Sequence, residues 1–231
     1  MISHSIEWRI EVTGGEKRAL FEPATGTPLA TYIFAHGAGG HMSDRGMMAL
    51  AERLRALGLN VVRFNFLYRE RGSGRPDPMP DLLACTEAVV ARARTDIAPE
   101  VLLIGGRSMG GRAASVLASQ GVPSDGLLLF AYPLHPAGKP DKLRDAHLPA
   151  IKAPVLCFNG TRDTLCQREL MERVLARVGP AWTMHWLEGA DHSFHVLRSS
   201  GRTNDAVLDE VSGATATWLS RLTPAPHPAP S

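Results

Sequence analysis

The stretch that decides the fold is VLLIGGRSMGGR, residues 101–112, where an apolar run leads through Gly-Arg-Ser-Met-Gly into a helical pattern. A serine with glycine two positions before and after it is typical of a nucleophile elbow, the tight turn that presents a serine between a strand and a helix. The G-x-S-x-G pattern alone is moderately specific, and its strand-to-helix context makes it more so. The alternative is a serine that caps a helix in a glycine-rich turn. We predict that Ser108 is a nucleophile.

On both sides of this turn, apolar runs of strand length alternate with helix-like stretches. The predicted strands are 29–35, 60–66, 101–106, 126–134, 153–159 and 182–188, and the predicted helices are 44–58, 80–97, 109–121, 167–179 and 204–222. Strands that are nearly all apolar and alternate with helices indicate a parallel sheet covered on both faces. Residues 5–12 and 17–23 flank Gly14-Gly15 and add a β-hairpin, which gives eight strands in all.

We therefore predict one α/β domain over residues 1–222. No connection between elements exceeds about 20 residues, which is too short for a separate cap domain. The tail TPAPHPAPS, residues 223–231, is rich in proline and is predicted to be disordered.

Charge and composition narrow the function classes. The net charge of +2 comes from 25 basic and 23 acidic residues without a basic block, so nucleic acid and anionic membranes are not expected partners. No apolar run is long enough to span a bilayer and no leader pattern opens the chain, so a cytoplasmic protein is expected. Cys85, Cys157 and Cys166 are expected to be free thiols. The oligomeric state cannot be inferred.

A serine nucleophile needs a base and a group that orients the base, in the chain order Ser, acid, His. His192 lies in EGADHSFH, where the chain leaves the last predicted strand through a glycine, and is the predicted base; His195 is the alternative. Asp163 ends GTRD after the preceding strand and is the predicted acid, with Asp191 as the competing carboxylate and helix capping as another role for Asp163. His185 falls inside a strand and is expected to be a wall residue.

The oxyanion of an acyl-transfer reaction needs two N–H donors. The residue after the nucleophile, Met109, is one candidate. HGAGG at residues 36–40 follows an early strand and supplies the second, for which we predict Ala38, with Gly39 as the alternative. Two pairs of histidines are candidate metal ligands, His36 with His41 and His192 with His195. Neither pair has further ligands at metal-binding spacing, so neither a metal nor a cofactor is predicted.

Several motifs in order resemble one known family: HGAGG, RFNF, GGRSMGGR, YPLHPAGKPDKLR, HLPAI, GTRD and DHSF. This α/β-hydrolase-like family is typified by testis-expressed protein 30 and the third subunit of the NSL chromatin complex, and the resemblance covers about residues 29–198. More distantly, the chain is similar to dienelactone hydrolases and short capless esterases. The resemblance implies an α/β-hydrolase fold with Ser108, Asp163 and His192 as serine, acid and histidine. FLY at 66–68 departs from the proline expected after FNF, so the geometry of that loop is open.

These residues predict a serine hydrolase that cleaves a small carboxylic ester or thioester through an acyl-enzyme. The alternative is a non-catalytic binding scaffold, which the resemblance also suggests because some members sit in a chromatin assembly. Tyr132, His135 and Lys139 lie at the end of the strand after the elbow and are predicted to line the substrate pocket. Basic residues are expected around its mouth and predict short acyl chains, with tolerance of an anionic substituent: Arg69, Arg71, Arg75, Lys139, Lys142 and Arg144.

Overall fold

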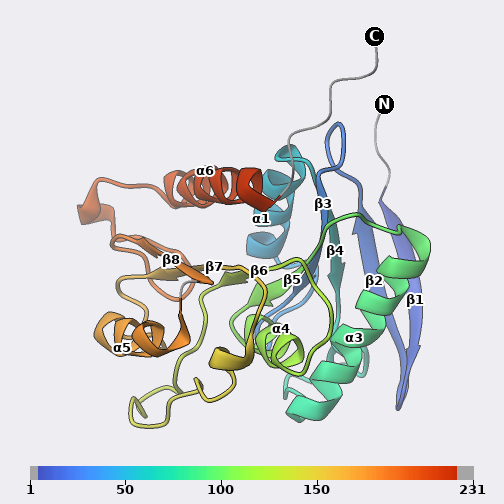
Figure 1. Ribbon diagram of the computed structural model, residues 1–231, viewed down its shortest axis with the longest axis horizontal. Coiled ribbons are helices and arrows are strands. Elements are labelled where there is room, and N and C mark those ends of the chain that lie inside the picture. The colour runs from blue at the N-terminus through green and yellow to red at the C-terminus, as the bar shows by residue number, and fades with distance from the viewer. Residues whose placement is uncertain (1–4, 180, 223–231) are drawn as a thin grey trace.

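The computed structural model describes residues 5–179 and 181–222, and its centre is one sheet of eight strands (Figure 1). The strands are β1 Ile6–Val12, β2 Gly15–Glu22, β3 Ala30–Ala35, β4 Leu59–Phe64, β5 Leu102–Arg107, β6 Gly126–Phe130, β7 Val155–Gly160 and β8 Trp182–Leu187. Their order is β1-β2-β4-β3-β5-β6-β7-β8. β2 is antiparallel to both of its neighbours, and every other pair is parallel. The predicted fold class is confirmed; the tail 223–231 lies outside the described residues.

Helices cover both faces of the sheet. They are α1 Arg45–Ala56, α2 Leu67–Glu70, α3 Met79–Asp96, α4 Met109–Ser119, α5 Arg168–Val178 and α6 Asn204–Leu222, with short 3-10 helices η1 Leu148–Ala150 and η2 Arg198–Ser200. Figure 1 shows α1 and α6 on one face and α3, α4 and α5 on the other. This arrangement explains why the central strands are apolar at nearly every position.

The core is divided between the two faces because successive side chains of a strand point in opposite directions. Ile33 and Ile104 belong to the core on the α3 and α4 side, whereas Phe34 and Leu103 belong to the core on the α1 and α6 side. β3 is buried at all six positions. Cys85, Cys157 and Cys166 are buried free thiols.

One predicted strand is too long. The apolar run 126–134 was predicted to be extended throughout, but β6 ends at Phe130. Ala131 has φ 53°, a left-handed conformation that L-residues rarely adopt, and its N–H still donates to Phe158 O at 2.7 Å. The chain therefore leaves the sheet at Ala131, four residues earlier than hydrophobicity alone indicates.

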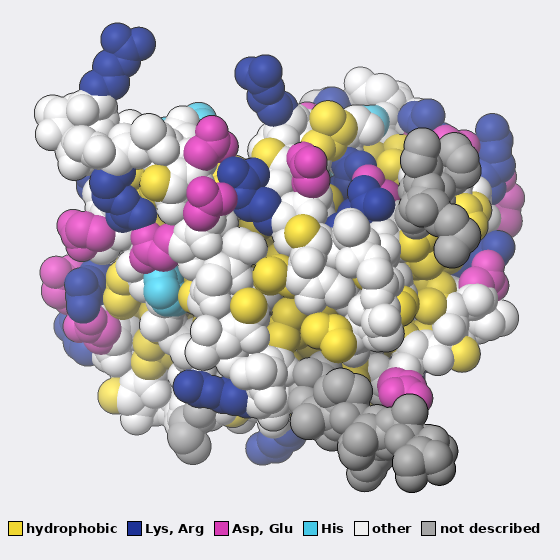
Figure 2. Space-filling view, turned by 90° about the horizontal axis from the view of Figure 1, so that it is seen from above, with side chains coloured by type: hydrophobic (Ala, Val, Ile, Leu, Met, Phe, Trp, Pro, Cys, Tyr) yellow, Lys and Arg dark blue, Asp and Glu magenta, His cyan; other side chains and the backbone are white. Residues whose placement is uncertain are grey.

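The face covered by α1 and α6 is seen in Figure 2, where acidic and basic side chains are interspersed around apolar ones. Arg53 on α1 forms ion pairs with Asp205 and Asp209 on α6, at 3.2 and 3.0 Å. Within residues 5–179 and 181–222, no helix is both long and apolar enough to cross a bilayer.

The topology creates a crevice at the carboxyl ends of the central strands. β3 pairs with β4 on one side and with β5 on the other, so the loops that follow β3 and β5 diverge. Ligands of open α/β sheets bind where the strand order reverses in this way. The HGAGG loop follows β3 and Ser108 follows β5, so both lie at this edge.

Candidate active site

Ser108 occupies a strained turn between β5 and α4, with φ 49° and ψ −115°. Glycine at positions 106 and 110 makes this turn sterically possible. A Cβ on Gly106 would lie 2.4 Å from Ala35 O, and one on Gly110 would lie 2.6 Å from the carbonyl oxygens of both Ala35 and His36. The elbow therefore packs directly against the end of β3, and Ser108 stands at the carboxyl edge of the sheet.

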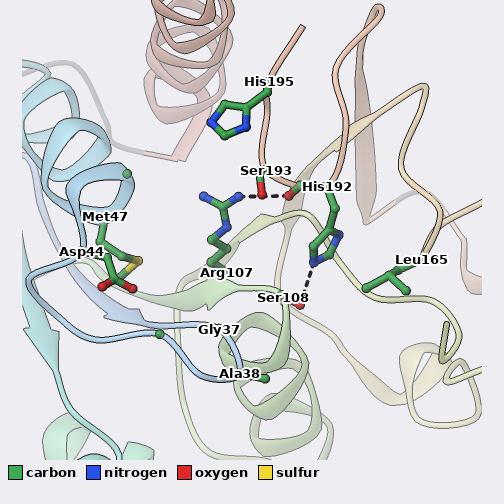
Figure 3. A pocket seen from close by; sticks show the side chains of 12 residues that line it. Gly37, Ala38, Asp44, Met47, Arg107, Ser108, Leu165, His192, Ser193 and His195 are labelled. Atoms are coloured by element: carbon green, nitrogen blue, oxygen red, sulfur yellow. Dashed lines mark hydrogen bonds between the residues drawn. The ribbon is translucent and has the colours of Figure 1, made fainter. Parts of the chain in front are cut away.

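The loops after β7 and β8 bring Asp163 and His192 to Ser108. Ser108 Oγ lies 2.9 Å from His192 Nε2, and His192 Nδ1 lies 2.8 Å from Asp163 Oδ2. Figure 3 shows the imidazole of His192 pointing at the serine. The three side chains that sequence order selected thus form one continuous hydrogen-bonded chain.

Asp163 is positioned as a buried acceptor. Its side chain is fully buried. Oδ2 accepts from Asn159 Nδ2 at 3.0 Å, and Oδ1 accepts from Leu165 N at 2.8 Å. It does not cap α5, because that position belongs to Gln167. A carboxylate can only accept, so Nδ1 of His192 carries the proton and Nε2 is left to accept from the hydroxyl of Ser108.

The competing residues have other contacts. Asp191 Oδ1 accepts from the N–H groups of Ser193 and His195 at 2.7 and 2.9 Å, and so stabilises its own loop. The ring of His195 lies beyond Arg107 from Ser108 (Figure 3). His185 on β8 bonds Glu210 on α6 at 2.8 Å, so it joins a strand to a helix.

Two amides beside the serine have no partner. Ala38 lines a cavity together with Ser108, and Met109 is the first residue of α4. Within the described residues, neither N–H donates a hydrogen bond. The first N–H groups of a helix have no intrahelical acceptor, so Met109 has a free donor by its position. The arrangement can bind an oxygen that gains negative charge next to Ser108.

His36 holds the loop that carries Ala38. Its Nδ1 donates to Gly37 O at 2.8 Å, and its Nε2 accepts from Phe66 N at 3.2 Å. Burial lowers the pKa of His36 to about 4, so the ring is neutral at ordinary pH. Within the described residues, no group of three or more His, Cys, Asp or Glu side chains is placed to hold a metal ion.

Tyr68 supports the same loop from the segment where the chain departs from the family pattern. α2 begins at Leu67, the position where the resemblance leads one to expect proline. The hydroxyl of Tyr68 accepts from Gly39 N at 3.2 Å. Its own N–H donates to Asp77 Oδ2 at 2.9 Å.

Arg107, the variable residue before the serine, reaches across to the histidine loop. Its Nη2 donates to His192 O at 3.0 Å, and its guanidinium lies 5.6 Å from the ring centroid of Phe194. Burial lowers the pKa of Arg107, and carboxylates of Asp191, Asp163 and Asp44 partly oppose this effect. Arg107 therefore links the elbow to the loop that carries His192.

Two cavities meet at Ser108. The larger one has a volume of about 510 Å³ and is lined by Arg107, His192 and His195 among others (Figure 3). The smaller one, about 340 Å³, is lined by Met109, Arg112, Pro133, His135, Pro136 and Arg144 among others. Ala38, Ser108 and Leu165 belong to both walls. Ser108 therefore lies between two cavities, which could hold the two parts of a molecule bound at the serine.

The residues predicted to line the substrate pocket are separated by the structure. His135 lines the smaller cavity. Tyr132 does not, because it is fully buried in the core and its hydroxyl donates to Arg144 O at 2.6 Å. The left-handed turn at Ala131 directs Tyr132 inward. Lys139 is exposed and lines neither cavity.

The basic residues expected around the mouth are also dispersed. Of the six named from sequence, only Arg144 lines a cavity that includes Ser108. Arg71 and Arg75 line a different hollow, where Arg71 pairs with Asp77. Sequence analysis missed Arg112, although its position four residues after Ser108 places it one helical turn along the same face. No sequence pattern predicted the roles of Arg107, His36 or Tyr68.

An eight-stranded, mostly parallel sheet with a Ser-His-Asp hydrogen-bonded chain at its carboxyl edge is the arrangement of the α/β-hydrolases. The chain belongs to the alpha/beta hydrolase domain family, whose model matches residues 28–220. The narrower resemblance to the group of testis-expressed protein 30 stays a prediction.

Solved structures share the fold over nearly the whole chain. A serine hydrolase without a lid from Xanthomonas campestris has a TM-score of 0.76 at 22% identity, covering 97% of this chain and 98% of that one. A serine hydrolase homologue from Coxiella burnetii has a TM-score of 0.75 at 20% identity, covering 93% and 97%. A dienelactone hydrolase from Anabaena variabilis has a TM-score of 0.74 at 19% identity, covering 96% and 99%. At these identities the likeness is one of fold.

Proposed function

We propose that this protein is a serine hydrolase that cleaves a small carboxylic ester or thioester through an acyl-enzyme on Ser108. The observation that carries the proposal is the unbroken series of hydrogen bonds from Asp163 through His192 to Ser108. A serine hydroxyl is a weak nucleophile and needs this kind of oriented base. The presence of serine hydrolases and esterases among proteins of the same fold supports it.

The first half of the reaction forms the acyl-enzyme. Ser108 Oγ attacks the carbonyl carbon while its proton passes to His192 Nε2, and the N–H groups of Ala38 and Met109 bind the resulting oxyanion. The intermediate then collapses: the bond to the alcohol or thiol breaks, and the leaving atom takes the proton from His192. Asp163 stabilises the imidazolium that exists between these two transfers.

The second half restores the enzyme. A water molecule gives a proton to His192 Nε2 and attacks the acyl carbon, and the oxyanion forms again between Ala38 and Met109. Ser108 Oγ leaves as the acid is released and regains the proton from His192. No metal or cofactor takes part in these steps.

The two cavities divide the substrate between them. His192 must protonate the leaving group, and His192 lines the larger cavity but not the smaller one. The leaving group therefore occupies the larger cavity, and the acyl group extends past Met109 into the smaller one.

A fluorophosphonate probe tests the proposal, because it labels a serine only when that serine is activated. The wild-type protein should be labelled and the Ser108→Ala variant should not. Ser193→Ala is the matched control, since Ser193 lines the same cavity without bonding His192 Nε2 and labelling should persist. If the wild-type protein is folded but not labelled, the alternative function as a non-catalytic binding scaffold is favoured. If the Ser108→Ala variant is still labelled, the nucleophile is another residue.

Substrates with short acyl chains should be preferred. The smaller cavity has charged side chains in its wall and a volume of only about 340 Å³. Each methylene left unburied forfeits about 0.8 kcal/mol, so a long chain gains little there. In a nitrophenyl ester series, kcat/KM should be higher from acetyl to hexanoyl than for palmitoyl. A maximum at twelve carbons or more would contradict this.

A further inference from the structure

The smaller cavity beside Ser108 carries positive charge that no acidic side chain of the described residues neutralises by an ion pair. Arg112 on α4 and Arg144 in the segment after β6 both line it. Among residues 5–179 and 181–222, no carboxylate forms an ion pair with either arginine. Arg144 Nη1 makes only a long contact of 3.4 Å to Pro133 O. Burial, and next the guanidinium of Arg112, lower the pKa of Arg144. Two like charges thus face a hollow without compensation.

The same wall contains buried polar atoms without partners. His135 is 1% exposed, and its Nε2 has no hydrogen-bond partner among the residues that the structure describes. Arg112 Nε is likewise buried and unpartnered. Leaving such an atom unsatisfied is unfavourable, so their coincidence in one cavity indicates a ligand that supplies the missing partners.

The orientation of the His135 ring determines which hydrogen-bonding group it presents to the cavity. Its Nδ1 lies 3.0 Å from Pro136 O, which can only accept, so the proton of the neutral ring is on Nδ1. Nε2 of this neutral ring is then an acceptor, for which a hydroxyl group of the ligand is a suitable donor. The planar guanidinium groups of Arg112 and Arg144 match the two oxygens of a carboxylate.

We propose that the smaller cavity binds a carboxylate carried by the acyl group, so that the substrates are monoesters or monothioesters of short dicarboxylic acids. This inference rests on the proposed function, because it uses Ser108 as the site of acyl transfer. Arg112 is four residues after Ser108, about 6 Å along the helix axis, which suits a second carboxyl group only a few bonds from the ester carbonyl. Acids of the succinic and glutaric type have this length.

A matched pair of esters tests the charge preference. Monobenzyl glutarate and benzyl pentanoate share the leaving group and the acyl length, and a benzyl leaving group keeps spontaneous attack by the second carboxylate slow. In the wild type, kcat/KM should be at least tenfold higher for the glutarate ester, mainly through a lower KM. Equal values for the two esters would overturn the proposal.

Substitutions locate the effect. Arg112→Met and Arg144→Met should each reduce kcat/KM at least tenfold for the glutarate ester, with little change for the pentanoate ester. Lys142→Met removes the same charge from an exposed position outside both cavities and should keep the preference. An equal loss for both esters in the arginine variants would assign these residues a structural role and contradict the proposal.

Binding without turnover separates this inference from the proposed function. Calorimetry on Ser108→Ala should detect monobenzyl glutarate and not benzyl pentanoate, and Arg112→Met in that background should abolish the heat. This result would stand even if Ser108 were not a nucleophile. Inorganic phosphate provides the last comparison: binding as tight as that of glutarate would show a general anion site and overturn the carboxylate assignment.

Discussion

The two cavities beside Ser108 both contain arginine, but the arginines differ in their surroundings. In the larger cavity, Arg107 donates to His192 O, lies over the ring of Phe194 and has three carboxylates nearby. In the smaller cavity, the charge of Arg112 lowers the pKa of Arg144 in addition to the effect of burial, and no acid within the described residues pairs with either arginine.

This difference in surroundings indicates two roles for arginine, one structural and one in binding a ligand. An arginine whose charge and N–H groups are satisfied by the protein fixes the parts that it joins, here the elbow and the histidine loop. Burial of an arginine whose N–H groups lack protein acceptors is unfavourable in free energy, unless a ligand supplies the acceptors. We therefore expect a change to Arg107 to affect every substrate, and changes to Arg112 or Arg144 to affect mainly anionic substrates.

The largest expected effect concerns the two histidines of the larger cavity. His192→Ala should lower kcat by at least about a thousandfold for every ester, because it removes the proton acceptor of Ser108. His195→Ala is the matched change in the same loop and should leave kcat within about threefold. Steady-state rates on a neutral ester measure both. The reverse ranking would make His195 the base in place of His192.

The predicted site residues that the structure brings together are those fixed by local pattern and chain order. A strand, a glycine turn and a helix identify Ser108, and the ends of parallel strands must share an edge, so Asp163 and His192 had to approach it. Tyr132 was misplaced because the apolar run 126–134 was predicted to be extended to the edge of the sheet, whereas β6 ends at Phe130 and the chain turns at Ala131, whose φ is 53°. No apolar pattern encodes such a turn at an alanine.

The wall of the smaller cavity was harder to predict because it combines distant segments. Arg112 comes from α4, whereas His135 and Arg144 come from the segment between β6 and β7. Counting basic residues in loops selected Arg71 and Arg75, which lie elsewhere. What distinguishes Arg112 and Arg144 is that both line a cavity beside Ser108 without an acidic ion-pair partner among the described residues, and only a three-dimensional structure reveals this.

The next largest effect is on stability and involves His36, which holds the loop of Ala38. Burial lowers its pKa to about 4 from an unfolded value of about 6.5, so between these pH values the unfolded chain binds more protons. The free energy of unfolding should therefore fall as the pH drops through this window, by up to about 3 kcal/mol from this residue. Below pH 4 its contribution should level off.

Urea unfolding of the wild type and of His36→Gln between pH 4 and 7.5 measures this dependence. The variant should show a shallower slope, whatever its absolute stability. His147→Gln is the comparison, since the pKa of His147 is also lowered to about 4. By the same linkage its removal should flatten the slope by a similar amount; a slope unchanged in His36→Gln would show that the pKa of His36 is not lowered by folding.

A smaller effect separates Arg107 from Arg112. Arg107→Met should lower the free energy of unfolding by about 1–3 kcal/mol, because His192 O loses a charged donor and the packing on Phe194 is lost. Arg112→Met should be neutral or slightly stabilising, since it removes repulsion with Arg144 and a buried N–H without a partner. Thermal and denaturant unfolding of both variants provide the comparison. A larger loss for Arg112→Met would mean that it, too, is structural.

The smallest effect is a change in the pKa of His147, whose Nε2 lies 2.8 Å from Ser115 Oγ on α4. Burial is the main reason that its pKa is lowered to about 4, and the charge of Arg112 is the next. A bound carboxylate would offset the charge of Arg112 but not the burial, so saturating glutarate should raise the pKa by only about half a pH unit. Titration of the ring by NMR, assigned with His147→Gln, measures the change. In Arg112→Met the pKa should be higher from the start, and glutarate should no longer move it. If glutarate still raised the pKa of His147 in Arg112→Met, the anion would bind away from Arg112. The smaller cavity would then not differ from the larger one as a site for anions.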